Sequence, residues 1–144
     1  MLCVNTYPQE YINDCRARVN AQLAAYENLI SATGDKTAVQ AFEPVFFNNL
    51  VLLLDQLFVH RSRTLELKDG NPLNEVRVLC NSLLNNNSKL MADKGIRLLP
   101  AKSILKIQVG DEIRLSKADF TRLADAFFAE IEVKFCEPVA LSAN

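Results

Sequence analysis

The segment that most constrains this chain is an apolar run at residues 45–59. Of its 15 residues 11 are apolar, and the exceptions fall in two pairs seven residues apart, Asn48 with Asn49 and Asp55 with Gln56. On a helix this spacing gives one narrow polar stripe and leaves the rest of the circumference hydrophobic. The run is shorter than the roughly 20 apolar residues of a membrane span. We therefore expect a central helix that is covered by other helices and, in part, by a second copy of the chain.

Residues 8–34 have the periodicity of an amphipathic helix. Apolar residues recur there at steps of three and four, between a proline suited to a first helical position and a glycine suited to the position after the last turn. Residues 36–42 predict one or two further helical turns. Pro44 then either opens or kinks the central helix, which turns polar after position 59 and is expected to end near Gly70.

Two later helices are predicted from their first residues. Asn71 followed by Pro72 is a strong start signal, and this third helix is expected to end at the polar loop 85–88. Ser116 and Asp119 resemble a capping box, with Asp in place of the usual Glu. They open a last helix with the apolar stripe Phe120, Leu123, Phe127, Ile131 and Phe135.

Between the third and last helices the apolar period changes to two. Leu105, Ile107 and Val109 alternate with polar residues, and Ile113 and Leu115 do the same after an intervening Gly-Asp pair. Alternating runs joined by Gly-Asp predict a β-hairpin with a two-residue turn.

These segments together predict a mainly α fold. We expect a four-helix up-down bundle-like domain with a small β-hairpin between the third and last helices. A length of 144 residues is usual for one domain, so residues 1–144 are assigned to a single domain. Its ends, residues 1–7 and 137–144, are expected to be frayed.

Composition narrows the classes of function. With 16 basic and 17 acidic residues the net charge is −1, so total charge gives no support for nucleic-acid binding. Four glycines are too few for glycine-rich phosphate loops. The four cysteines have no CxxC spacing, which favours reduced thiols and a cytoplasmic location. No membrane partner, cofactor or metal is expected, the last because Glu-x-x-His pairs and clustered His or Cys ligands are missing.

The densest group of ionisable and hydrogen-bonding residues lies at positions 60–77, between the second and third helices. His60 is the only histidine and has the side chain whose ordinary pKa is nearest neutrality. One interpretation gives it an acid or base role and gives the nearby arginines an anion-binding role. The other is a solvated helix end tied by ion pairs and caps. The candidate catalytic residues are His60, Arg61, Arg63 and Glu66, and the candidate ligand-binding residues are Asn71, Glu75 and Arg77.

Residues 58–84 and 109–115 resemble a family of small bacterial helical proteins to which no activity is assigned. The resemblance is carried by His60-Arg61-Ser62-Arg63, by Lys-Asp-Gly-Asn-Pro-Leu-Asn-Glu-Val-Arg at 68–77 and by Val-Gly-Asp-Glu-Ile-Arg-Leu at 109–115. It implies one domain and a bacterial cytoplasmic setting, and it implies no function. Helical ribonuclease toxins are similar in architecture alone, because their Arg-x4-6-His motif has no counterpart before His60.

Two hypotheses from different classes follow. The first is a non-enzymatic domain that self-associates as a dimer and binds a protein partner or small ligand beside the polar residues at 60–77. The alternative is a hydrolase or ribonuclease-like enzyme that uses His60 with Arg61 or Arg63, which requires an accessible histidine near an arginine-bound anion or a carboxylate. The interface residues expected under the first hypothesis are Phe46, Leu50, Leu53, Leu54 and Leu57.

Overall fold

The computed structural model describes residues 3–138; residues 1–2 and 139–144, which belong to the ends expected to be frayed, lie outside the described residues. Within residues 3–138 there is no strand, and only isolated β-bridges occur. The predicted mainly helical fold is confirmed. The elements are α1 (Gln9–Ala32), α2 (Lys36–Leu57), α3 (Arg63–Glu66), α4 (Pro72–Asn85), a 3-10 turn (Pro100–Lys102) and α5 (Lys117–Phe135).

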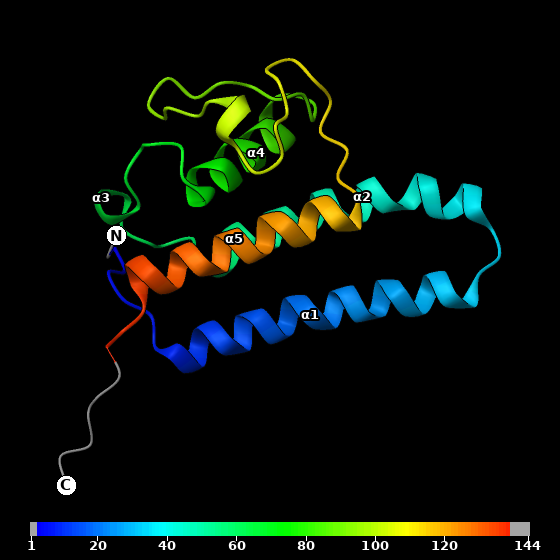
Figure 1. Ribbon diagram of the computed structural model, residues 1–144, viewed down its shortest axis with the longest axis horizontal. Coiled ribbons are helices and arrows are strands. Elements are labelled where there is room, and N and C mark those ends of the chain that lie inside the picture. The colour runs from blue at the N-terminus through cyan, green and yellow to red at the C-terminus, as the bar shows by residue number, and fades with distance from the viewer. Residues whose placement is uncertain (1–2, 139–144) are drawn as a thin grey trace, which may run out of the picture.

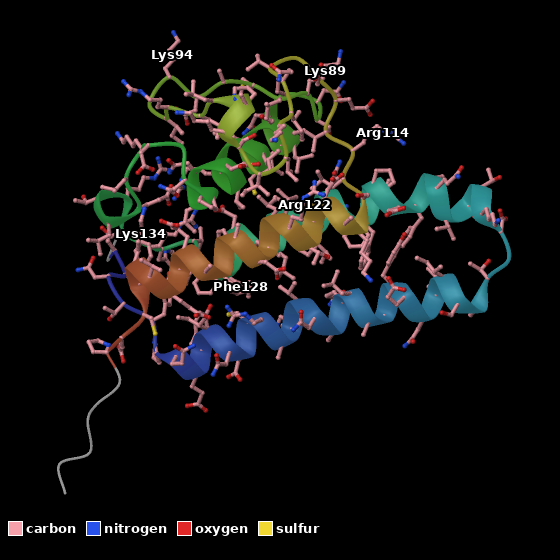
Figure 2. The ribbon with its side chains drawn as sticks, in the orientation of Figure 1. Lys89, Lys94, Arg114, Arg122, Phe128 and Lys134 are labelled. Atoms are coloured by element: carbon pink, nitrogen blue, oxygen red, sulfur yellow. The ribbon has the colours of Figure 1, made fainter. Side chains whose placement is uncertain are left out.

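The four longer helices pack around one core. α1 and α2 form an antiparallel pair, α5 lies along both of them, and α4 packs against α2 and α5 on the side away from α1 (Figure 1). Phe128 of α5 faces α1 (Figure 2), where its ring lies 4.9 Å from the Arg16 guanidinium. The predicted α5 stripe is confirmed, because its five apolar members are all fully buried.

Local signals account for the starts of α4 and α5. The Asn71 side chain accepts hydrogen bonds from the main-chain N–H groups of Leu73 and Asn74, and Pro72 is the first helical residue. At α5 the Ser116 and Asp119 side chains form the reciprocal capping box. Both predicted helix starts are confirmed. Each depends on residues that lie close together in the sequence, which is why the sequence could predict it.

α2 differs from the prediction at both ends. It begins at Lys36, where the Asp35 side chain caps it, and it continues through Pro44. Pro44 removes one main-chain hydrogen bond, but the residue whose carbonyl loses its partner, Gln40, is exposed to water. The helix ends at Leu57, so the predicted continuation towards Gly70 is wrong.

Arg61 accounts for the early end of α2. Its main-chain N–H and its side-chain Nη1 both donate to the Phe58 carbonyl, each at 3.1 Å. The chain therefore turns sharply after Phe58 and places the Arg61 guanidinium inside the molecule. The short helix α3 follows as a separate element.

The predicted β-hairpin at 105–115 is wrong. The N–H groups of Ile104 and Leu105 donate to the Glu75 carboxylate, at 2.8 and 2.9 Å, and are not available to a neighbouring strand. Lys106 has φ of +57°, a left-handed conformation that interrupts an extended run. The segment is an irregular chain laid over α4.

The second half of the expected hairpin is held by a helix side chain. Asn48 of α2 donates to the Ile113 carbonyl at 2.8 Å and accepts from the Leu115 N–H at 3.2 Å. The amide thus makes both hydrogen bonds that a neighbouring strand residue would make. Ile113 and Leu115 are buried, which accounts for the apolar alternation that the sequence displays.

Residues 4–7 connect two distant parts of the fold. Val4 donates to the His60 carbonyl at 2.7 Å and accepts from the Ser62 N–H at 2.8 Å. Tyr7 donates to the Phe135 carbonyl, and its own carbonyl accepts from the Glu137 N–H at 3.0 Å. Although this segment was expected to be frayed, its described part lies between the end of α2 and the end of α5.

Candidate functional site

The polar residues at 60–77 are organised around one buried carboxylate, that of Glu66 on α3. Arg61 donates from Nε to Glu66 Oε1 at 2.7 Å. Arg77 of α4 donates from Nη2 to the same oxygen at 2.6 Å and from Nε to Oε2 at 3.1 Å. Glu66 and Arg61 are both 2% exposed. Because water is excluded, each charge depends on its partners for stabilisation.

Two asparagines and a lysine complete this arrangement. Asn74 donates to Glu66 Oε2 at 2.8 Å and to the Leu67 carbonyl at 3.0 Å. The Glu66 carbonyl accepts from Asn71 Nδ2 at 2.8 Å and from Lys134 Nζ at 2.9 Å. Lys134 lies near the end of α5, beside α3 (Figure 2). Arg61, Glu66, Asn74 and Arg77, with Lys134, form what we call the Glu66 network.

Opposing effects determine the pKa of Glu66. Burial raises it, while the hydrogen bond from Arg77 and the charges of Arg61 and Arg77 lower it, and the pKa lies below its ordinary value. Glu66 is therefore ionised at neutral pH. With both oxygens occupied, it is an ion-pair partner and is poorly suited to transfer protons.

The polar stripe of the central helix divides between the interior and the surface. Asp55 Oδ1 lies 3.0 Å from Arg61 Nη1, an ion pair in which this oxygen accepts no aligned hydrogen bond from the described residues. Asn48 holds the 113–115 segment, whereas Asn49 and Gln56 are exposed. One side of the stripe thus fixes the chain's own segments, and the other side faces solvent.

His60 and Arg63 lie outside the Glu66 network. Both are exposed, whereas Arg61 between them is buried. Among residues 3–138, the His60 side chain makes no hydrogen bond or ion pair, and the Arg61 guanidinium is occupied by Glu66 and Asp55. Arg61 is therefore not available to bind an anion beside His60, whereas Arg63 is exposed to solvent.

Glu75 is a second buried carboxylate, and its partners are main-chain N–H groups of a loop. It is 3% exposed, and its two oxygens accept the N–H groups of Ile104 and Leu105. Burial raises the pKa of this carboxyl above its ordinary value, although the two hydrogen bonds lower it in part. Glu75 therefore fixes the irregular segment to α4.

The residues predicted to bind a ligand all have structural partners. Asn71 caps α4 and donates to the Glu66 carbonyl, Glu75 holds residues 104–105, and Arg77 pairs with Glu66. Sequence reasoning had missed Lys134, whose only signal is a cation in the last turn of a predicted helix. It had also missed Asp93 and Gly95, which reach the same region from a distant loop.

A small cleft of about 60 Å³ opens beside the network. Arg63, Lys68 and Arg77 line it on the α3 and α4 side, and Asp93 and Gly95 line it from the loop after α4. We call it the basic cleft. Within residues 3–138 no group of three His, Cys, Asp or Glu side chains is placed to hold a metal ion.

The cysteines are free thiols. Cys15 and Cys80 are buried, as expected for small apolar side chains. Burial raises the pKa of the Cys80 thiol, and the thiol therefore stays protonated and unreactive at neutral pH.

The residues predicted to form an interface differ in their accessibility. Leu50 and Leu54 are buried inside the chain, while Phe46, Leu53 and Leu57 are partly buried against its core. α2 is also the one helix among the described residues that is long and apolar enough to cross a membrane by length and composition, with a mean hydropathy of 1.3 over its most apolar 18-residue window. Core helices of soluble proteins pass the same test.

No protein-family model, curated protein or solved structure matches this chain.

The free energy of unfolding should depend on pH through the ionisation of Glu66. Because its folded pKa is lowered, the ionised carboxylate stabilises the fold above the unfolded value of about 4.3, and this contribution is lost as the pH falls through the folded pKa. The contribution of Glu75 to stability changes with pH in the opposite direction, because the pKa of its carboxyl is raised in the folded state. We therefore compare the chain with Glu66→Gln by urea unfolding from pH 7 to pH 3. The difference in free energy of unfolding should shrink on acidification, and a constant difference would contradict the assignment.

Proposed function

We propose that this chain is a non-enzymatic helical domain that works as a self-associated dimer joined through α2. We take α1, α2, α4 and α5 as one bundle-like unit, and we take the Glu66 network as its rigid base. A cytoplasmic setting, and the bacterial one that the resemblance implies, belong to the same proposal. The alternative enzyme, in which His60 acts with Arg61 or Arg63, has weaker support, because the Arg61 guanidinium is occupied by Glu66 and Asp55 and only Arg63 is exposed.

The observation that carries this proposal is the poor coverage of α2. Only 22% of the residues in its most apolar 18-residue window are fully buried within the chain, and others, such as Leu52 and Leu53, are partly buried against the core. An apolar helix with so little burial needs a further surface to cover it. The residues concerned recur at steps of three and four along α2, a row that we call the outer stripe: Phe42, Val45, Asn49, Leu52 and Gln56. All of them are exposed except Leu52, which is partly buried against the core.

The outer stripe continues into a shallow groove. Val45 and Leu52 line it from α2, and Leu83 and Leu84 line it from the end of α4, around a volume of about 290 Å³. Val45 is 59% exposed and Leu84 is 68% exposed. Two neighbouring helices thus offer one apolar surface that the chain itself leaves open.

A second copy of α2 is the occupant that this surface favours. Neither the groove nor the outer stripe contains a charged residue, so a copy related by a two-fold axis meets no like charge. Steps of three and four residues suit two helices that pack side by side. The Asn49 amide donates to the Val45 carbonyl at 2.8 Å. Its second N–H and its oxygen, like the amide of Gln56, can still donate and accept hydrogen bonds, which allows each residue to pair with its equivalent in the second copy.

A membrane is the other possible cover for α2, and the polar residues argue against it. Asp55 is committed to Arg61 and Asn48 to the 113–115 segment, so a spanning α2 would have to break these contacts. Asn49 and Gln56 would then lie in the hydrocarbon, where an amide has few partners.

The test compares one substitution at two exposed helix positions. Val45→Glu should shift the dimer towards monomer, with a dissociation constant at least about tenfold higher, because two carboxylates then face each other. Val133→Glu, at the 82% exposed Val133 on α5, changes the same side chain elsewhere and should leave assembly unaltered. Sedimentation equilibrium at micromolar concentration measures both.

Three outcomes would count against the dimer. The unaltered chain could sediment as a monomer, or both variants could weaken assembly equally, which would leave α2 with no special part. The third is co-flotation with neutral lipid vesicles that Val45→Glu abolishes, which would identify a membrane as the cover. Circular dichroism of each variant shows whether its helices are retained.

A further inference from the structure

The balanced net charge conceals an uneven distribution along the chain. Residues 61–106 contain nine basic and four acidic residues, whereas the whole chain carries −1. Two of those four acids, Glu66 and Glu75, are buried and hydrogen-bonded internally. The surface formed by α3, α4 and the loop after α4 is therefore basic; Lys94 projects from the outer edge of that loop (Figure 2).

The basic cleft lies in this surface, and its charges are not all matched. Inside the network, Arg61 and Arg77 are offset by Asp55 and Glu66. Arg63 and Lys68 are exposed and form no ion pair among residues 3–138.

Arg77 presents a preorganised donor to the cleft. Its Nε and Nη2 are held by Glu66 at 3.1 and 2.6 Å, and its Nη1 donates to no acceptor among the described residues. The guanidinium is planar, so fixing one edge also fixes the other. Such an edge is suited to a phosphate oxygen, and little side-chain freedom remains to be lost on binding.

The walls of the basic cleft are also fixed. Arg97 donates its main-chain N–H to the Lys68 carbonyl at 2.9 Å, which holds the 93–97 loop against the turn after α3. Gly70 permits this approach, because a Cβ there would lie 2.4 Å from the Arg97 carbonyl oxygen. Leu67 adopts φ of +67° and ψ of −176°, a conformation almost restricted to glycine, and Asn74 holds its carbonyl.

We propose that the basic cleft binds a phosphate group, with Arg63, Lys68 and Arg77 as its donors. The cleft volume of about 60 Å³ is enough for a few water molecules and so for one compact tetrahedral oxyanion, with the remainder of a phosphate ester left outside. Asp93 opposes binding through its charge, although its Oδ1 is occupied by the Gly95 N–H at 2.8 Å. This inference does not depend on self-association through α2.

The experiment follows main-chain amide resonances of the full chain during titration with inorganic phosphate at constant ionic strength. Gly95, Ile96 and Lys68 should shift together and saturate. A parallel titration with glycerol 3-phosphate separates the two sources of the group: equal or tighter binding indicates an ester, and binding of inorganic phosphate alone indicates the free ion.

Matched double variants test which charged side chains are responsible for phosphate binding. Arg63→Ala with Lys68→Ala removes two exposed cations from the cleft and should weaken binding at least tenfold. Arg18→Ala with Lys36→Ala removes an arginine and a lysine, also exposed, from α1 and α2 and should leave binding within twofold. Asp93→Asn keeps the acceptor for Gly95 and should tighten binding severalfold.

The proposal is overturned if no amide saturates, or if both double variants weaken binding equally, which would indicate a response to total charge only. It is also overturned if Asp93→Asn has no effect on affinity. The unliganded spectrum of each variant establishes that its fold is retained, so that loss of binding is not mistaken for unfolding.

Discussion

We expect Glu66→Ala to lower the free energy of unfolding by about 3–5 kcal/mol, the usual consequence of removing one partner from a buried ion pair. Arg61, whose side chain is fully buried, would keep only Asp55 as a counter-charge, and Arg77 would lose both of its acceptors on Glu66. Asn74 would lose an acceptor as well. Urea unfolding followed by circular dichroism measures the change.

The matched control is Glu112→Ala, which removes a glutamate from a pair with Arg114 whose side chains are both more than half exposed. Exposed pairs contribute about 0–1 kcal/mol, so this variant should unfold almost as the unaltered chain does. If Glu66→Ala were equally mild, the Glu66 network would not be the base that holds α3, α4 and α5 together.

Glu75→Ala should be the second most damaging change. Hydrogen bonds to a charged group contribute about 1.5–3 kcal/mol each, and two are lost. The raised pKa of Glu75 indicates that burying its charge is itself unfavourable, and water can reach the freed N–H groups when the segment lifts. We therefore expect a net loss of about 2–4 kcal/mol.

Hydrogen exchange locates this effect. In Glu75→Ala the amides of Ile104 and Leu105 should exchange much faster, while those of α1 should change only in proportion to global stability. Glu75→Gln keeps one carbonyl acceptor and should leave one of the two amides slow. Unaltered protection of both amides in Glu75→Ala would mean that the 103–106 segment is held by other contacts.

The features that the sequence could predict are those encoded by neighbouring residues. Asn71 with Pro72 and Ser116 with Asp119 start their helices through contacts within four residues, so the signal is local. The end of α2 is different, because it depends on whether Arg61 is buried. That burial requires partners on α3, and neither the polarity of His60 nor that of Arg63 indicates which of the three side chains turns inward.

The prediction of a β-hairpin at 105–115 was wrong for a related reason. Alternation at 105–115 does identify an extended chain with one buried side, and Ile113 and Leu115 do face the core. An apolar period of two does not reveal, however, which groups form hydrogen bonds with the main chain of the segment. Here the partners include Glu75 and Asn48, side chains of helices 29 to 67 positions away, and no local pattern pairs a helix amide with a distant main chain.

The sequence predicted that the charged residues of the candidate site lie close together, but it did not predict which of their side chains are buried and which are exposed. The charges at 60–77 do gather, yet only the fold separates the buried pair of Arg61 and Glu66 from the exposed His60 and Arg63. Asp93 and Gly95 join the basic cleft through a loop whose path is set by Gly70. Sequence spacing carries no information about that path.

The position of α5 affects the order in which the chain can fold during synthesis. The five fully buried side chains of its stripe pack in the core with α2 and α4, and Tyr7 pairs with residues 135 and 137. Until α5 has emerged from the ribosome, α2 lacks one of the two helices that cover it most, the other being α4. The nascent chain therefore exposes apolar surface of α2 until α5 can pack on it, and chains that expose such surface during synthesis are prone to aggregate.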